Sequence, residues 1–187
     1  MKRMIPIVCT FLAVAASALA QAPAAASSPE IDKALTAAPR QMRDGATVIK
    51  WKADFTYDTL RKGTNRLVCY DRSGQPGQTQ PFSVECTSIA NLDRVAQNLK
   101  FEAIADKAAS KAAFDAAEAN GTRVKPEFGS VWIHASGPDA EHLRTHTTIA
   151  VPGATTASLG LPDNARQGGV WIMNAGTTTA HLMTPGS

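Results

Sequence analysis

A stretch without glycine or proline, from Ser88 to Ala119, separates two regions of the chain that are rich in short β-like runs. Alanine and charged residues dominate this stretch, a composition typical of helix. Asn120-Gly121 follows it as a C-terminal cap. We therefore predict one long Ala-rich helix, or a helix pair broken near Asn98. Its apolar face is expected to hold residues that recur with the helical period, namely Phe101, Ile104, Ala105, Ala108 and Ala112.

Runs rich in β-branched and aromatic residues lie on both sides of this helical stretch, and turn signals separate them. The pattern predicts an antiparallel β-sheet and an α+β fold in a single domain over residues 46–187. Ahead of it, 21–45 forms an Ala/Pro/Ser-rich spacer and a short peripheral helix over 29–37, which Ser28-Pro29-Glu30 begins. The predicted strands are 46–51, 55–60, 67–70, 82–86, 130–134, 147–152, 169–173 and 180–183.

The first residues have the features of a secretory signal peptide. Lys2 and Arg3 supply positive charge, and the sixteen residues from Ile5 to Ala20 carry none. That run is shorter than the ~20 residues of a spanning helix, which argues against the alternative of a membrane anchor. Ala18-Leu19-Ala20 has the small-x-small pattern of a cleavage site, so we predict that 1–20 is removed after Ala20. The expected location is periplasmic or secreted.

Removal of this leader brings the chain close to electrical neutrality. The whole sequence has 19 Lys and Arg against 16 Asp and Glu, and two of the basic residues leave with the leader. Nucleic-acid-binding domains usually carry a clear basic excess. The composition therefore excludes a nucleic-acid partner, and the absence of a second long apolar run predicts no membrane span after cleavage.

Two cysteines remain after the leader is removed. Cys69 and Cys86 form an even pair, which in an oxidising compartment indicates one intramolecular disulfide. The bond would close a loop of about eighteen residues and stabilise the fold by ~3 kcal/mol in the chain-entropy model. Two free thiols, or two ligands to a soft metal, are the alternatives.

All four histidines fall in the last third of the chain. His142 and His146 are four residues apart, so a helix would place both imidazoles on one face, within reach of one metal ion. His134 and His181 could supply further ligands, and zinc or copper would suit such a site. Structural histidines in strands and turns are the alternative, and no resident cofactor is predicted.

The standard catalytic and nucleotide-binding motifs are absent from the sequence, including Gly-x-Ser-x-Gly and His-Glu-x-x-His. This leaves open whether the protein is an enzyme, but it favours a non-catalytic domain that binds a ligand or partner in the cell envelope. A histidine-dependent metal-binding protein or hydrolase is the alternative. Trp51, Trp132 and Trp171 suit a core, or a platform for a sugar or peptide ligand.

Near its end the chain contains three short motifs: Gly168-Gly169-Val170-Trp171-Ile172-Met173, then Ala175-Gly176-Thr177, then Ala180-His181-Leu182-Met183 with Pro185. In these motifs it resembles a family of uncharacterised exported bacterial proteins. The positions of Cys69 and Cys86 also fit. Because that family has no established activity, the resemblance implies export, a disulfide and a single domain, and no particular chemistry.

Overall fold

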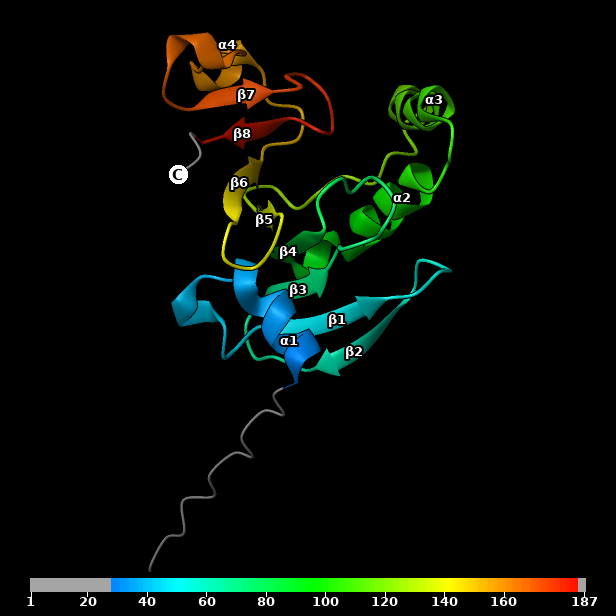
Figure 1. The fold of residues 1–187 in the computed structure, drawn as a ribbon. Helices are drawn as coiled ribbons and strands as arrows, with labels where there is room; N and C mark the ends of the chain where they lie inside the picture. The colour runs from blue at the N-terminus through cyan, green and yellow to red at the C-terminus, as the bar shows by residue number, and fades with distance from the viewer. Residues whose placement is uncertain (1–27, 185–187) are drawn as a thin grey trace, which may run out of the picture.

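The computed structural model describes residues 28–184 and shows an α+β fold built on one eight-stranded sheet (Figure 1). The predicted signal peptide, its cleavage site after Ala20, and Pro185 of the C-terminal motif lie outside the described residues. Along the sheet the strands follow the order β2-β1-β3-β4-β5-β6-β8-β7. The α+β class predicted from the sequence is thus confirmed.

Each predicted strand corresponds to a strand of the sheet, with shifts of a few residues at the ends. The strands are β1 (Thr47–Trp51), β2 (Tyr57–Arg61), β3 (Leu67–Asp71), β4 (Phe82–Ser88), β5 (Val131–Gly137), β6 (Arg144–Ala150), β7 (Trp171–Met173) and β8 (His181–Met183).

The sequence predicted an antiparallel sheet, but the sheet is mixed. β1 runs parallel to β3, with Thr47 opposite Val68 and Val48 opposite Cys69, whereas the other neighbouring strands are antiparallel. β2 folds back antiparallel along one edge of β1. The chain then crosses to the other edge of β1, where β3 runs in the same direction as β1.

The first helix belongs to the core, which corrects the prediction that it is peripheral. α1 (Pro29–Ala34) continues as the short 3-10 helix η1 (Leu35–Ala37), and the Ser28 side chain caps its first turn. Ile31, Ala34 and Leu35 are buried against the face of β3, β4 and β5 that carries the two cysteines. A spacing of three and four residues puts these three side chains on one stripe of the helix, which explains the burial.

The predicted disulfide lies in the same layer. Cys69 and Cys86 face each other directly across β3 and β4, and they form a disulfide with a Cα–Cα distance of 4.1 Å. Both residues are fully buried, and Cys86 Sγ lies 3.9 Å from the carbonyl oxygen of Ala34 in α1. The disulfide therefore joins two adjacent strands beneath the first helix.

The central Ala-rich stretch folds as two helices, which excludes one long helix. α2 (Leu92–Glu102) ends at Ala103, and α3 (Lys107–Ala119) begins after Asp106, whose side chain accepts a hydrogen bond from the Ala109 amide. The break is therefore an Asp N-cap and does not lie near Asn98, which is inside α2. Asn120 ends α3 as predicted.

The face that α2 buries also differs from the predicted one. Leu92, Val95 and Leu99 pack on the sheet against Val68 and Tyr70 of β3. Ile104 and Ala105, which a continuous helix would have placed on the buried face, are exposed in the link between the helices. α1 covers the opposite face of the sheet. The half of the sheet that contains β1 and β3 is therefore packed on both faces.

The C-terminal part forms a smaller cluster around Val151, Ile172 and Ala180. It contains the β7–β8 hairpin and the short helix α4 (Thr156–Leu159) in the loop that precedes the hairpin. None of the helices within residues 28–184 has both the length and the apolar character needed to cross a bilayer.

Candidate functional site

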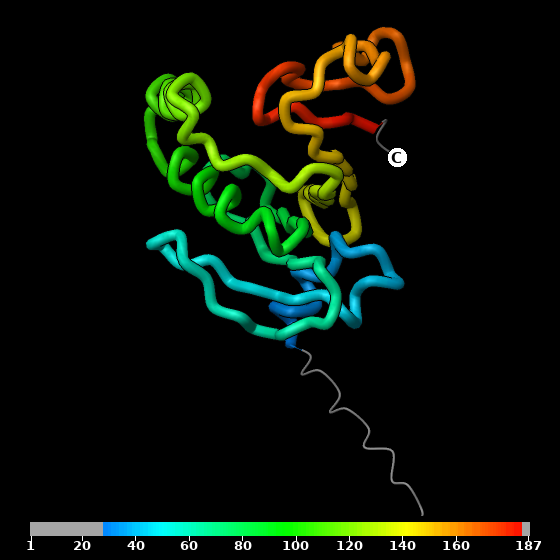
Figure 2. The backbone as a smooth tube through the Cα atoms, turned by 180° about the vertical axis from the view of Figure 1, so that it is seen from behind, coloured from blue at the N-terminus to red at the C-terminus, as the bar shows by residue number. Residues whose placement is uncertain are grey.

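A cleft of about 1090 Å³ lies between the α2–α3 pair and the sheet face formed by β4, β5, β6 and β8. Seen from behind, the two green helices stand apart from the orange and red C-terminal hairpin (Figure 2). Trp132 of β5 and Thr148 of β6 line the sheet side, and Phe114 of α3 lines the helix side. The wall also contains charged side chains, and six of them form two groups near the two ends of α2.

The first group contains two buried arginines. Arg94 is 4 % exposed and Arg123 is 5 % exposed, and both line the cleft. Within residues 28–184 neither guanidinium forms an ion pair with a carboxylate. Buried arginines are normally paired with an anion, because a buried charge without one is costly. The two guanidiniums are therefore buried positive charges that no carboxylate of residues 28–184 pairs with directly.

Arg94 lies near the start of α2 and reaches the segments that precede β5 and β8. One terminal nitrogen donates to the carbonyl oxygen of Val124, and the other donates to Thr179 Oγ1 at 3.1 Å. Burial, together with the nearby positive charge of Arg123, lowers the pKa of Arg94 to about 10. The guanidinium is still charged at neutral pH, and two neutral oxygens are its protein partners.

Arg123 is held by neutral groups as well. Its terminal nitrogens donate to the side-chain oxygens of Gln97 and Asn98 on α2. Its guanidinium carbon lies 4.9 Å from the ring centroid of Phe114 and 5.8 Å from that of Phe101, distances of cation–π contacts. Burial lowers its pKa, which the more distant Glu118 and Glu102 partly oppose.

Glu118 of α3 is the acidic member of this group. Its two oxygens accept hydrogen bonds from the backbone and the hydroxyl of Thr178, ahead of β8. Partial desolvation disfavours its charge, but these bonds and the two arginines hold its pKa below the usual value. With one carboxylate to two guanidiniums, this end of the cleft keeps an excess of positive charge.

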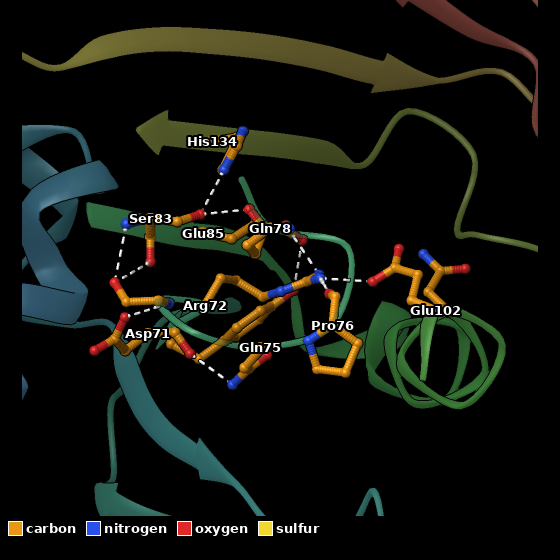
Figure 3. A network of polar contacts seen from close by, with 12 residues as sticks. Asp71, Arg72, Gln75, Pro76, Gln78, Ser83, Glu85, Glu102 and His134 are labelled. Carbon is orange, nitrogen blue, oxygen red and sulfur yellow. Dashed lines mark hydrogen bonds and ion pairs between the residues drawn. The ribbon is translucent and has the colours of Figure 1, made fainter. Parts of the chain in front are cut away.

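The second group lies at the other end of α2 and has an excess of negative charge (Figure 3). Arg72, 3 % exposed, donates to Glu102 Oε2 at 2.7 Å and lies 3.7 Å from Glu85 Oε2. The buried hydroxyl of Tyr70 donates to Glu85 Oε1 at 2.5 Å. Glu85 projects from β4 and Glu102 ends α2, so the pair spans the two walls of the cleft.

Burial shapes the protonation of this group. It raises the pKa of Tyr70 well above the usual value, because both desolvation and the adjacent Glu85 charge oppose ionisation. Burial also raises the pKa of Glu102, although Arg72 works against it. Burial opposes the charge of Arg72, but the two carboxylates outweigh it and raise its pKa. Two carboxylates therefore share one guanidinium.

The structure separates the four histidines that the sequence placed in one site. His134 on β5 and His146 on β6 are directly opposite each other across the two strands. His142 lies on the exposed turn between them, where its ring nitrogen Nδ1 is 2.8 Å from Asp139 Oδ1. His181 lies on β8 opposite Ala150, and it lines the cleft.

The expected helix through His142 and His146 is absent, because residues 144–150 pair with β5 as a strand. His142 therefore stays in the turn ahead of β6, and the helical geometry that would bring it onto one face with His146 does not form. Among the residues that the structure describes, no three His, Cys, Asp or Glu side chains gather closely enough to hold a metal ion.

His134 has a specific setting (Figure 3). Its Nε2 lies 2.9 Å from Ser83 Oγ, and Ser83 in turn donates to Gln78 Oε1 at 2.6 Å. Ser83 is fully buried, so this pair does not present a nucleophile to the cleft. Burial lowers the pKa of His134, and of the nearby charges Glu85 opposes that shift while Arg72 and His146 add to it.

The three tryptophans take different positions. Trp51 is buried between Tyr57 and Tyr70, with ring centroids 5.4 Å and 5.8 Å away, and belongs to the core. Trp171 is half-buried on the edge strand β7. Trp132 lines the cleft, so it is the tryptophan available to a ligand there.

The chain matches no protein-family profile, and neither a curated protein nor a solved structure is detectably similar to it. The geometry of the cleft is therefore the basis for its functional interpretation.

The charged residues of the cleft did not stand out in the sequence. Arg72, Arg94 and Arg123 lie far apart in the chain, and no motif links them. One signal was present: Arg94 falls between Leu92 and Val95, on the part of α2 that packs on the sheet. A charged residue next to the apolar stripe of a helix is worth noting, because full burial of arginine is rare without a partner.

Proposed function

We propose that this protein is an exported, non-catalytic domain that binds a small anionic ligand in the cleft between α2–α3 and the sheet. The observation that carries the proposal is the pair of buried guanidiniums, Arg94 and Arg123, which line the cleft without an ion-paired carboxylate within residues 28–184. Arginine forks suit carboxylate and phosphate groups. The disulfide suits a periplasmic or secreted location.

Binding is favoured over catalysis because the hydroxyl groups that could act as nucleophiles are buried or already hydrogen-bonded. Ser83 is buried, and the Tyr70 hydroxyl is already bonded to Glu85. The hydroxyls of Thr148 and Thr179 remain at the cleft wall, where they can donate to a bound oxygen. An anion held beside Arg94 and Thr179 would neutralise buried charge, which supplies the driving force for affinity.

The test is a thermal-shift screen of the mature protein against small carboxylates and phosphates, followed by calorimetric titration of compounds that raise the melting temperature. Arg94→Lys keeps the charge but removes the fork, and it should weaken binding by about tenfold or more. Arg66→Lys is the matched control, because Arg66 is exposed and pairs with Glu127 outside the cleft. If no anionic compound binds, or if both variants bind like the wild type, the proposal is wrong.

One observation favours the alternative of a metal-binding protein: His134 and His146 are opposite neighbours on one sheet face. Cβ atoms of such pairs lie ~5 Å apart, so one zinc or copper ion could bridge two imidazoles and take its other ligands from solvent. Native mass spectrometry of protein prepared without chelators tests it. A stoichiometric metal that disappears in His146→Gln would support this alternative, and its absence from the wild type would reject it.

A further inference from the structure

Glu118 of α3 is bonded to the segment ahead of β8 in the way that a bound carboxylate would be. Thr178 donates its backbone N–H to Glu118 Oε1 at 2.6 Å and its hydroxyl to Oε2. The next residue, Thr179, accepts a hydrogen bond from the Arg94 guanidinium. Two donors for two carboxylate oxygens, with a guanidinium nearby, are the contacts of charge-assisted carboxylate recognition. A side chain of the protein itself thus occupies this arrangement, which we call the Thr178 site.

The Thr178 site is held in place by its own segment of chain. Thr177 Oγ1 accepts the N–H of Thr179 at 3.1 Å and donates to the Asn174 carbonyl oxygen at 2.8 Å. Neither bond uses Glu118. The two donors of Thr178 should therefore keep their position when the Glu118 carboxylate leaves.

The helix that carries Glu118 can release it at little cost. Among residues 28–184, Glu118 makes the hydrogen bonds that join α3 to the segment ahead of β8, and α3 stands apart from the β7–β8 hairpin (Figures 1 and 2). α3 is otherwise attached to α2, where the rings of Phe114 and Phe101 are 5.0 Å apart. Ala117 is the buried residue of α3, so loss of the Glu118 contact exposes little apolar surface.

Of the two buried arginines, Arg94 belongs to the Thr178 site. The carboxylate whose charge acts on Arg94 is Glu118, whereas Arg123 interacts with both Glu118 and Glu102. A carboxylate that replaces Glu118 would therefore lie in the field of Arg94.

We propose that the ligand of the cleft binds through a carboxylate group and competes with Glu118 for Thr178. The ligand takes over the two hydrogen bonds, and α3 is released from the segment ahead of β8. The class is a carboxylate because the group that now fills the site is a planar pair of oxygens, each with one donor. This inference rests on the proposed function and narrows it from anions in general to carboxylates.

The first experiment empties the Thr178 site and uses acetate as the probe. In Glu118→Ala, acetate should raise the melting temperature at about one tenth of the concentration that the wild type needs, with chloride at equal ionic strength as the reference. Inorganic phosphate should be less effective. Glu127→Ala is the matched control, because Glu127 also accepts from an arginine, Arg66, and a hydroxyl, that of Ser88, but lies outside the cleft. It should respond to acetate like the wild type.

A second pair of variants keeps the shape of the side chains. Glu118→Gln replaces the competing carboxylate by a neutral amide, so calorimetry should show acetate bound about tenfold more tightly than by the wild type. Adding Thr178→Val removes the hydroxyl donor and should reverse most of this gain. A Glu118 with a purely structural role would cost stability when replaced and would create no affinity.

The outcomes separate this inference from the proposed function. If the wild type binds anions and Glu118→Gln binds acetate no more tightly, competition is overturned and anion binding stands. If phosphate stabilises Glu118→Ala as well as acetate does, the carboxylate class is overturned. If acetate binds only the Glu118 variants and the wild type binds no anion, the Thr178 site is supported and the proposed function fails. If neither the wild type nor a variant binds any anion, both fail.

Discussion

Cys69 and Cys86 lie directly opposite each other on β3 and β4, and their disulfide is fully buried beneath α1. The bond is part of the core layer that also contains Ile31, Ala34 and Val84. It therefore restricts the unfolded chain and fills space in the folded protein, two effects that a surface disulfide does not combine.

The double variant Cys69→Ala, Cys86→Ala should lose about 2–5 kcal/mol in free energy of unfolding, measured by urea denaturation. Dithiothreitol should destabilise the wild type in the same direction and leave the double variant unchanged. Equal urea midpoints for the wild type and the double variant would show that the bond contributes no stability.

Acid should destabilise the protein in part through His134. Burial lowers the pKa of this residue below 6.5 in the folded state, so the unfolded chain takes up its proton at a higher pH. The stability that the neutral imidazole contributes is present above 6.5 and is lost as the pH falls toward the folded pKa. The free energy of unfolding should therefore decrease on acidification through this window.

His134→Gln keeps a donor for Ser83 and does not titrate, so it should flatten this pH dependence. His142→Gln, on the exposed turn, is the control and should retain the wild-type slope. Urea midpoints measured between about pH 5 and pH 7 decide the matter. Parallel curves for His134→Gln and the wild type would exclude His134 as a source of the dependence.

Asn91 should be among the most sensitive polar residues outside the cleft. It is fully buried, donates to Thr87 and Ser130 at 2.9 Å each, and accepts from the Glu127 amide at 2.9 Å. Asn91→Ala would remove all three hydrogen bonds from a fully buried position, at a cost of about 3 kcal/mol in unfolding free energy. Asn164→Ala removes only a local cap in an exposed loop and should cost ~1 kcal/mol or less. Chemical denaturation of both variants gives the comparison, and equal losses would contradict the role assigned to Asn91.

Gly63 should not tolerate even a methyl group. A Cβ there would lie 2.2 Å from the Gly45 carbonyl oxygen and 2.4 Å from the Ala46 carbonyl carbon, both backbone atoms. Gly63→Ala should therefore cost about 3 kcal/mol, because the turn before β3 must open. Gly153→Ala is the control: its φ of 79° brings strain, but nothing lies within 4 Å, so ~1 kcal/mol is expected. Thermal melts of both variants that coincide would refute the steric argument.

The positions of the strands could be predicted because local chemistry determines them. Turn residues such as Asp44-Gly45 border the runs of β-branched and aromatic residues, and each run forms a strand. The order of the strands in the sheet depends on contacts between distant residues, which the pattern does not contain. The parallel pairing of β1 with β3 is one example.

The helical stretch shows how a single polar residue outweighs composition. The alanine-rich sequence predicted one long helix or a pair broken near Asn98, but Asp106 caps a new helix and the chain turns there. The prediction of a helix through His142 and His146 was wrong for a similar reason, because local residue preferences outweighed the spacing. A spacing of four suits a helix at His142 and His146, but Thr147 and Thr148 favour the strand that forms.

The charged cleft could not be predicted for a different reason. Arg94 and Thr179 are 85 residues apart, and Arg72 and Glu102 are 30 residues apart. Only the packing of α2 on the sheet brings these groups together. Residues that a fold gathers from distant segments leave no spacing to recognise in one sequence.

The same separations set an order of assembly during synthesis. The cysteines are 17 residues apart on neighbouring strands, so they can join while much of the chain is still emerging. The cleft must wait for Thr179, which is close to the last strand. A chain synthesised from its N-terminus is therefore expected to bring its two cysteines together early and to complete the wall of the cleft last.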